Sequence, residues 1–280
     1  MGERKLEKSI YTELSPDDDY GAYLKLGRLL TAQEPLSEPP HPDEMLFIIQ
    51  HQVAELWLKL ILHEIERTMG YFRVDALQRA VKCLTRVRRV QDQMFNQWKV
   101  LDTLTPDEYA EFRGVFGKAS GFQSPQYRLL EFMLGNKNRG MLKVHRHHPA
   151  WHEALLERLE APSLYEEFLL HLSRTGLPVP NAAIDRDFSI VREPSAAVVD
   201  VLRTIYEDPS AHWALHEVCE ALMDVGNNFQ FWRFHHMKTV ERIIGHKRGT
   251  GGSSGVAFLK KAIEQEFFPE LIQVRTEIGR

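Results

Sequence analysis

An all-α fold is predicted for this chain of 280 residues from three observations. Apolar residues recur at the spacing of helix faces almost throughout, alternating strand patterns are nearly absent, and no Asn-Gly or Asp-Gly hairpin signal occurs. No internal repeat, low-complexity segment or shift in composition marks a boundary. We therefore expect residues 1–280 to form a single helical domain built on a bundle of long helices.

The first half of the chain alternates between strong helix signals and proline-rich breaks. The expected elements are, in order, a tail over residues 1–17, a short amphipathic helix over 20–32, an extended connector at the prolines of 35–42, a long helix over 43–69 with Asp43 as N-cap and Gly70 as C-cap, and a second long helix over 75–101.

Helix starts in the second half are marked by a capping residue followed by proline. The expected elements are a helix over 106–116 begun by Thr105-Pro106, a helix over 125–134 begun by Ser124-Pro125, one or two helices over 150–175 broken at Pro162, an irregular stretch over 176–194, a long helix over 208–244, a glycine-rich loop over 245–255 and a final helix over 256–267.

Composition excludes several classes of protein. Hydrophobic residues make up 43% and charged residues 26%, with a formal net charge of −4, so the chain lacks the basic field of a nucleic-acid binder. The basic residues Lys82, Arg86, Arg88 and Arg89 have no interleaved aromatic residues and favour a solvated helix face. The two cysteines form no CxxC pair, and no apolar run approaches roughly 20 residues. We expect a cytoplasmic protein with reduced thiols and no membrane or nucleic-acid partner.

The thirteen histidines do not show the spacing of common zinc sites. His63-Glu64 begins like an HExxH motif, but Arg67 stands where the second ligand is required. The cluster of His145, His147, His148 and His152 favours a solvated loop over a metal site.

Two other histidines lie on unusually apolar helix faces. His51 has Phe47, Ile48 and Ala54 beside it at helical spacing, and His236 has Phe229 and Trp232, whereas His235 faces a more polar stripe. A single histidine of this kind favours a core residue with a satisfied partner. Two of them on separate helices favour a haem between the helices, with one histidine on the iron and the other on the opposite face.

Two further features suit a carboxylate ligand. Tyr109 and Arg113 lie four residues apart on one helix face, where a phenol and a guanidinium can clamp an anion, although such a pair is also common at surfaces. The loop of residues 245–255 has five glycines and three hydroxyls before a helix start, which fits an anion cradle as well as a flexible surface loop.

The sequence resembles the tryptophan 2,3-dioxygenase family in its compact, bacterial form. The matching segments span residues 20–255 in the family's order, and they are Tyr20–Leu24, Glu44–Gln52, Glu55–Trp57, Thr105–Tyr109, Phe112-Arg113, Ser120–Ser124, Leu134–Lys137, Trp232–Met237 and Gly245–Gly255. The resemblance implies an all-α fold that encloses haem b, one per subunit, and the conversion of L-tryptophan and O2 to N-formyl-L-kynurenine, the first step of the kynurenine pathway.

The resemblance also implies roles for individual residues. His236 would be the axial iron ligand, with Ser120 and Gly121 close to the haem. His51 would be the catalytic distal residue beside the indole N–H. The implied substrate contacts within a subunit are Phe47, Ile48, Ile49, Gln50, His51, Tyr109, Arg113 and Thr250. The resemblance also implies a homotetramer, in which residues 1–42 would pack on a neighbouring subunit. Tyr20, Tyr23 and Leu24 would then contact the substrate of that neighbour.

Two other functions stay open at the level of sequence. A related haem enzyme acting on a different indole would use the same cofactor site, but Phe47, Arg113, Tyr109 and Thr250 fit an unmodified amino acid. A non-catalytic haem protein that senses a gas would account for His236 and leave Arg113 and Thr250 without a role.

Overall fold

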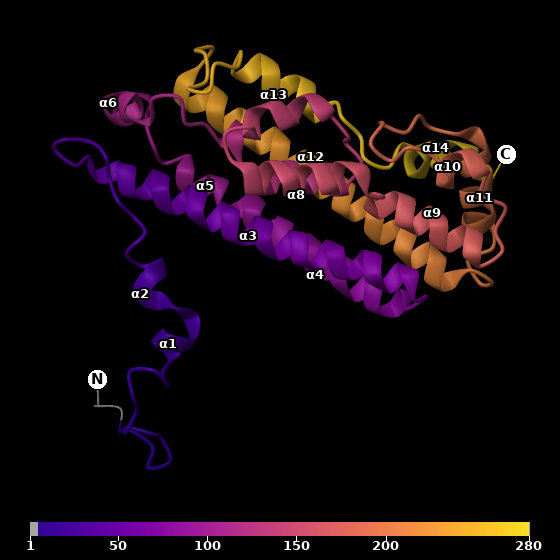
Figure 1. The fold of residues 1–280 in the computed structure, drawn as a ribbon, viewed down its shortest axis with the longest axis horizontal. Helices are drawn as coiled ribbons and strands as arrows, with labels where there is room; N and C mark the ends of the chain where they lie inside the picture. The colour runs from indigo at the N-terminus through magenta and orange to yellow at the C-terminus, as the bar shows by residue number, and fades with distance from the viewer. Residues whose placement is uncertain (1–4, 280) are drawn as a thin grey trace.

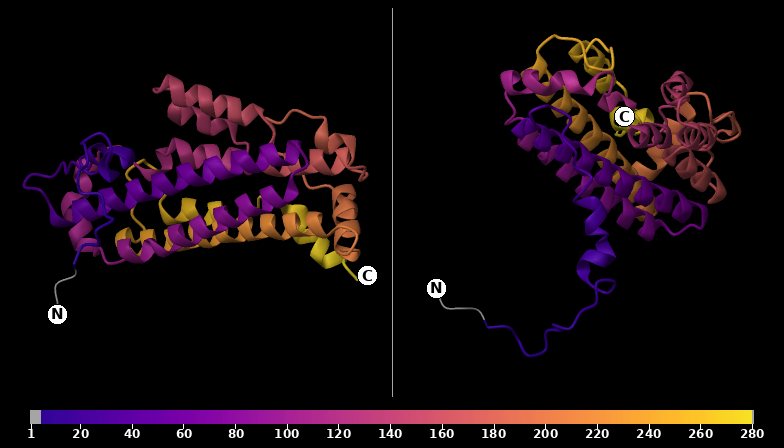
Figure 2. Two further views of the ribbon diagram at one scale, coloured as in Figure 1. Left: turned by 90° about the horizontal axis from the view of Figure 1, so that it is seen from below. Right: turned by 60° about the vertical axis from the view of Figure 1, so that its left-hand side comes forward.

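The computed structural model describes residues 5–279, and it contains helices and no strand over that range, which confirms the all-α prediction. Two helices of 32 residues form the frame, α3 (Pro42–Arg73) and α12 (Trp213–Ile244). Helix α4 (Leu77–Asn96) packs against both of them. The three run side by side along the length of the body (Figures 1 and 2).

The shorter elements cover this frame. They are α1 (Tyr20–Leu24), α2 (Leu26–Leu29), α5 (Trp98–Leu101), α6 (Pro106–Phe112), η1 (Arg113–Phe116), η2 (Gly121–Gln123), α7 (Pro125–Met133), η3 (Arg139–His145), α8 (Pro149–Glu160), α9 (Leu164–Arg174), α10 (Asn181–Ile184), α11 (Ala196–Glu207), α13 (Val256–Ile263) and α14 (Pro269–Glu277).

Helix α4 occupies the centre because one of its faces is apolar and the other is charged. The apolar face is buried and includes Ala80, Leu84, Val87, Val90 and Met94. The basic face is solvated, as predicted, and its arginines serve ion pairs within the chain. Arg86 donates to the buried Glu64 of α3 at 2.6 Å, and Arg89 pairs with Asp92 at 3.3 Å.

Several predicted boundaries are wrong. His41, not Asp43, caps α3, and its Nδ1 accepts from the Asp43 N–H. The helix continues past Gly70 because Phe72 is fully buried and holds one more turn in the core. Helix α12 begins at Trp213 rather than at residue 208, and α11 and α14 were not predicted. The predicted helix over 20–32 is divided at Lys25, whose φ is 55°.

The N-terminal segment, residues 5–41, extends away from the helical body (Figures 1 and 2). Its connector is extended over the prolines, as predicted. It is anchored at the start of α3, where Gln52 donates to the Ala32 carbonyl at 2.8 Å and Glu44 accepts from the Ser37 N–H at 3.0 Å. The part before this anchor contributes no buried residue to the body.

Both cysteines are free and buried, as the prediction of reduced structural thiols requires. The prediction of a solvated histidine cluster is wrong for His145, which is 4% exposed and whose pKa is lowered, mainly by burial. His147 and His148 are exposed. Within residues 5–279 no group of three or more His, Cys, Asp or Glu side chains is arranged to hold a metal ion.

One helix of the described chain is long and apolar enough to cross a membrane, by length and composition alone. It is α3, whose most apolar window of 18 residues has a mean hydropathy of 1.4, with 17% of that window buried. Core helices of soluble proteins meet the same two criteria, so this is weak support for a membrane span.

Candidate active site

The first turns of α3 carry an aromatic cluster at the end of the body nearest the loop of residues 245–255. The ring of Phe47 lies 4.6 Å from that of Phe116, 5.8 Å from that of Tyr109 and 6.0 Å from that of Phe112, measured between centroids. The helix spacing then places His51 one turn after Phe47, with 4.1 Å between ring centroids. The cluster forms an apolar wall beside a single imidazole.

His51 is held as one neutral tautomer. Its Nδ1 lies 2.7 Å from the carbonyl oxygen of Phe47, which can only accept, so Nδ1 carries the proton. Burial is the largest effect on the ring and lowers its pKa, although the Phe47 carbonyl and the charge of Glu55 oppose the shift. Near neutral pH the ring is therefore uncharged, and Nε2 presents a free lone pair that can accept a hydrogen bond.

His236 lies on α12 in an aromatic setting. Its ring stacks on Trp98 with 4.7 Å between centroids and an interplanar angle of 9°, and Trp232 lies 5.6 Å away. Burial, followed by the effect of the nearby His51, lowers the pKa of His236 to about 4. No described residue hydrogen-bonds to the ring. The result is a neutral imidazole with an available nitrogen lone pair, which is the form that binds iron.

The neighbouring His235 is already engaged. Its Nε2 lies 3.1 Å from Oδ2 of Asp102, and the Thr239 hydroxyl donates to Oδ1 of the same carboxylate at 2.6 Å. Its ring also lies 4.8 Å from that of Phe95 of α4. His235 therefore ties α12 to the segment around α5, and His236 is the imidazole of the pair that stays without a protein partner.

The two tryptophans that contact His236, and Gln97, which precedes one of them in the chain, carry buried polar atoms with no partner. These are both amide atoms of Gln97 and the indole nitrogens of Trp98 and Trp232. A buried donor without a hydrogen-bond partner lowers the stability of the fold by about 1–3 kcal/mol, so such groups normally bind a protein group, a water molecule or a ligand. A flat apolar cofactor with polar edges and an open metal coordination position fits this set, because aromatic rings, a neutral imidazole and free donors all occur together.

Tyr109 and Arg113 meet as the sequence predicted. The Arg113 guanidinium lies close enough to the Tyr109 hydroxyl to favour a lower pKa, but burial has the larger effect and raises the pKa of Tyr109. Arg113 also donates through Nη2 to the carbonyl of Arg248 in the loop. A neutral phenol and a half-buried guanidinium with further free N–H groups form a suitable clamp for a carboxylate.

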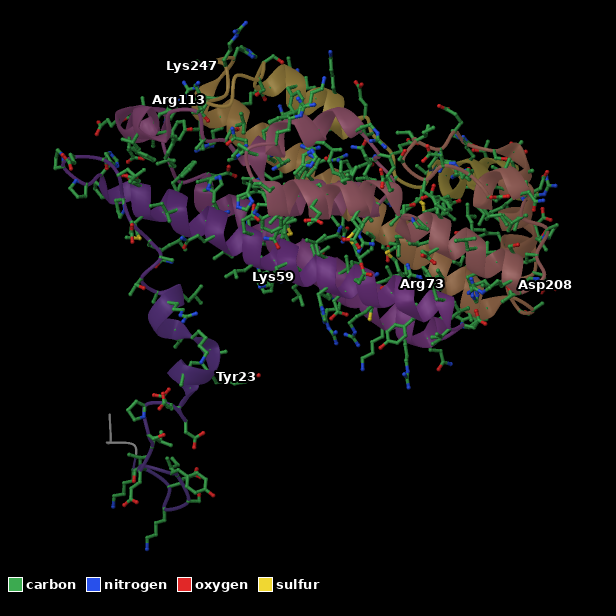
Figure 3. The ribbon with its side chains drawn as sticks, viewed as in Figure 1. Tyr23, Lys59, Arg73, Arg113, Asp208 and Lys247 are labelled. Carbon is green, nitrogen blue, oxygen red and sulfur yellow. The ribbon has the colours of Figure 1, made fainter. Side chains whose placement is uncertain are left out.

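The glycine-rich loop, residues 245–255, is packed onto the segment before η2. The Thr250 hydroxyl donates to the Ala119 carbonyl at 2.6 Å. A Cβ at Gly251 would lie 2.7 Å from Cβ of Ser120, so the contact requires glycine. Ser120 itself caps η2, which Gly121 begins. Predicted cofactor and substrate residues therefore come together here, and Arg113 and Lys247 lie near one another at one end of the body (Figure 3).

Other predicted site residues do not join this group within one chain. The Gln50 amide is buried and donates to the Gln97 carbonyl at 2.9 Å, which links α3 to the residue before Trp98. Ile49 is 44% exposed. Tyr20, Tyr23 and Leu24 are exposed on α1, and Figure 3 shows Tyr23 far from Arg113.

Sequence reasoning missed Trp98 and Phe116 as members of the site. Trp98 begins α5 two residues after the end of α4, and a tryptophan at this helix junction was the available signal. Phe116 follows Phe112 by four residues, the spacing that places both rings beside Phe47.

Comparison with known proteins gives one consistent family. The model of the family described as tryptophan 2,3-dioxygenase matches residues 9–178 and 185–278. The tryptophan 2,3-dioxygenase of Serratia proteamaculans is 53% identical over 279 residues, covering 100% of both chains. That of Myxococcus xanthus is 54% identical over 278 residues, covering 99% of this chain and 96% of its own, and that of Kineococcus radiotolerans is 53% identical over 276 residues with the same coverage.

Proposed function

The chain belongs to the tryptophan 2,3-dioxygenase family, and from this membership we propose that it inserts both atoms of O2 across the indole 2,3 double bond of L-tryptophan. The product is N-formyl-L-kynurenine, and the reaction begins tryptophan degradation by the kynurenine pathway. The observation that carries the proposal is a neutral, unpartnered His236 near His51, with Tyr109 and Arg113 beside the same aromatic wall. Conversion of L-tryptophan under air by the reduced, haem-loaded protein is the direct test.

The cofactor would be haem b, one per subunit, and His236 would bind its iron. Ser120 and Gly121 would contact the haem, and Trp98, which stacks on the His236 imidazole, would hold that ring in place. When bound, the ferrous haem supplies the activation of O2. The protein supplies orientation of the substrate, exclusion of water and the recognition of charge.

The indole ring is placed by α3. Phe47 and Ile48 supply apolar contact, and Nε2 of His51 accepts the hydrogen bond of the indole N–H, because Nδ1 is already donating to the Phe47 carbonyl. This role requires a neutral imidazole and not a strong base, which agrees with the lowered pKa of His51. Gln50 acts indirectly, because its hydrogen bond to the Gln97 carbonyl holds α3 in place.

The amino-acid end of the substrate is held by groups from three segments. The Arg113 guanidinium and the Tyr109 hydroxyl bind the carboxylate, and Thr250 contacts the same end of the molecule from the loop. The loop is already tied to both neighbours, since Arg113 donates to the Arg248 carbonyl and Thr250 to the Ala119 carbonyl. Substrate binding therefore closes a preorganised clamp.

The active enzyme is a cytoplasmic homotetramer in which the N-terminal segment of one subunit completes the site of another. Tyr20 and Tyr23 are 74% and 85% exposed, and Leu24 is 40% exposed, which is unfavourable for an apolar stripe unless another surface covers it. Residues 1–42 then pack on the neighbour, while residues 1–280 remain one domain.

Replacement of Arg113 by lysine should weaken tryptophan binding. Lysine keeps the charge and loses the planar fork, so part of a charge-assisted pair worth roughly 1.5–3 kcal/mol is lost and KM should rise about tenfold or more. Tryptamine, which lacks the carboxylate, should be a poor substrate of the wild type and should distinguish little between the two proteins. Equal KM values for tryptophan, or efficient turnover of tryptamine, would exclude Arg113 as the clamp.

Replacement of His51 by alanine should reduce turnover and leave haem binding unchanged. The lost hydrogen bond is neutral and worth about 0.5–1.5 kcal/mol, so kcat/KM should fall by roughly threefold to tenfold rather than to zero. A substrate methylated at the indole nitrogen cannot form this bond and should be less affected by the change. Complete loss of activity with haem retained would contradict the positioning role and indicate an obligatory base.

Deletion of residues 1–30 should remove most activity while the truncated protein still binds haem. The physical reason is loss of the apolar stripe formed by Tyr20, Tyr23 and Leu24. Deletion of residues 1–17, which keeps this stripe, is the matched control and should stay active. Haem content and tryptophan turnover of both proteins are measured together. A fully active, tetrameric protein lacking residues 1–30 would refute the exchange of segments between subunits.

A further inference from the structure

Arg233 is a buried cation close to the proposed haem ligand, and none of the roles proposed so far involves it. Arg233 precedes His236 by three residues on α12 and is only 3% exposed. Its Nε donates to the Tyr127 hydroxyl at 3.1 Å, Nη2 to Oε1 of Glu131 at 2.7 Å and Nη1 to the carbonyl of Ala262 at 2.8 Å. A guanidinium buried this deeply is normally found only where its donors are satisfied.

Aromatic rings complete the surroundings of Arg233. Its Cζ lies 4.8 Å from the ring centroid of Phe229 and 4.9 Å from that of Phe267. The ring of Tyr127, which accepts from Arg233, packs in turn on Trp232, with 5.6 Å between centroids. Trp232 contacts His236, so a chain of direct contacts leads from the guanidinium to the proposed ligand.

Arg233 joins three elements that each lead to a different part of the site. Helix α12 carries His236 one turn later. Helix α7, which bears Tyr127 and Glu131, follows directly after the segment that contains Ser120. The carbonyl of Ala262 lies near the end of α13, the helix that begins at the end of the glycine-rich loop. One side chain thus ties α12 to α7 and α13, the two helices that directly follow the Ser120 segment and the glycine-rich loop.

We propose that Arg233 is a positioning residue, which holds the helix of the ligand imidazole and the helix after the 245–255 loop in a fixed relative position. The proposal rests on the proposed function for its catalytic consequence, but its structural consequence does not depend on turnover. Lysine cannot replace it, because the three elements are reached by separate nitrogens of a rigid fork.

The charge balance around Arg233 makes the proposal testable by substitution. Glu131 is also bound by Arg128, so removing Arg233 leaves a paired carboxylate in the core rather than an isolated one. Arg233→Met also keeps the apolar contact with Phe229 and Phe267. Arg233→Lys, which retains the charge, gives the second variant if the methionine form does not fold.

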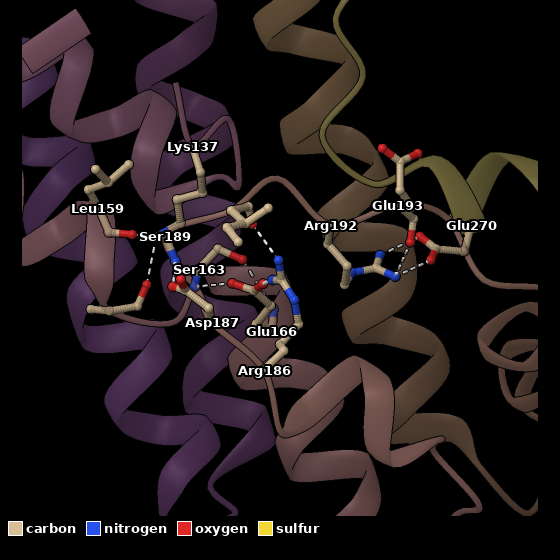
Figure 4. Close-up of polar contacts among 12 residues, drawn as sticks. Lys137, Leu159, Ser163, Glu166, Arg186, Asp187, Ser189, Arg192, Glu193 and Glu270 are labelled. Carbon is tan, nitrogen blue, oxygen red and sulfur yellow. Dashed lines mark hydrogen bonds and ion pairs between the residues drawn. The ribbon is translucent and has the colours of Figure 1, made fainter. Parts of the chain in front are cut away.

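A matched control is available at the other end of the body. Arg192 is partly buried and binds the fully buried carboxylate of Glu270 through both terminal nitrogens, and its Cζ lies 5.2 Å from the ring centroid of Tyr165. Figure 4 shows this pair near α14. Arg192→Met removes an Arg–Glu pair from residues that belong to no element of the site. It leaves the buried Glu270 without a cation, so it tests whether loss of stability alone raises the two rates measured below.

The experiment compares wild type, Arg233→Met, Arg233→Lys and Arg192→Met in two assays that need no turnover. These are the rate of trypsin cleavage after Lys247 and Arg248 in the haem-free protein, and the rate of haem transfer from the loaded protein to excess apomyoglobin. Loss of a charge-assisted bond should raise both rates about tenfold in Arg233→Met, with a smaller rise in Arg233→Lys. The control Arg192→Met should match wild type in both assays even if its Tm is lower.

Rates in Arg233→Met equal to those of wild type, or raised only as much as in Arg192→Met, would overturn the proposal. Steady-state kinetics add the catalytic consequence, which is a higher KM for L-tryptophan in Arg233→Met and not in the control. If the wild type does not convert tryptophan, the proposed function fails, whereas the cleavage assay still decides whether Arg233 holds the loop.

Discussion

A neutral imidazole kept in an aromatic environment without a protein partner is the constraint on which the rest of this structure depends. His236 meets this constraint for two reasons. Trp98 stacks on one face of its ring, and the carboxylate of Asp102 is already engaged by His235 and Thr239 and so does not bind His236. Holding a ring in this way requires rigid support. The long helices supply it, since α4 packs on both α3 and α12 and so fixes His51 and His236 in one frame.

The proposed site also accounts for the apolar surface of α3 that no other part of the same described chain covers. Only 17% of its most apolar window is buried, and Met45, Ile49 and Leu56 are exposed. In the proposed enzyme a cofactor and substrate cover one side of this helix, and a neighbouring subunit covers the other. The exposed stripe of α1 and the anchoring of the connector fit the same interpretation, because the segment is held only near its end, by Gln52 and Glu44 of α3 and by the contact between His41 and Glu111 of α6.

Local rules of sequence predicted much of the fold. The capping box at Thr105 and the serine cap at Ser124 gave correct helix starts, since a side chain that satisfies free N–H groups is visible in the sequence. The rules failed where tertiary packing decides. Gly70 does not end α3, because buried Phe72 stabilises a further turn. Trp98 was missed, because its stacking on His236 joins residues far apart in the chain.

The central claim, that His236 is the haem ligand, is tested most directly by the haem content and ferric absorption spectrum of two single variants. His236→Ala should lose stable haem or show altered ligation. His235→Ala should keep a normal spectrum, because His235 is engaged with Asp102 instead. A wild-type spectrum and full haem content in His236→Ala, with loss confined to His235→Ala, would contradict the account.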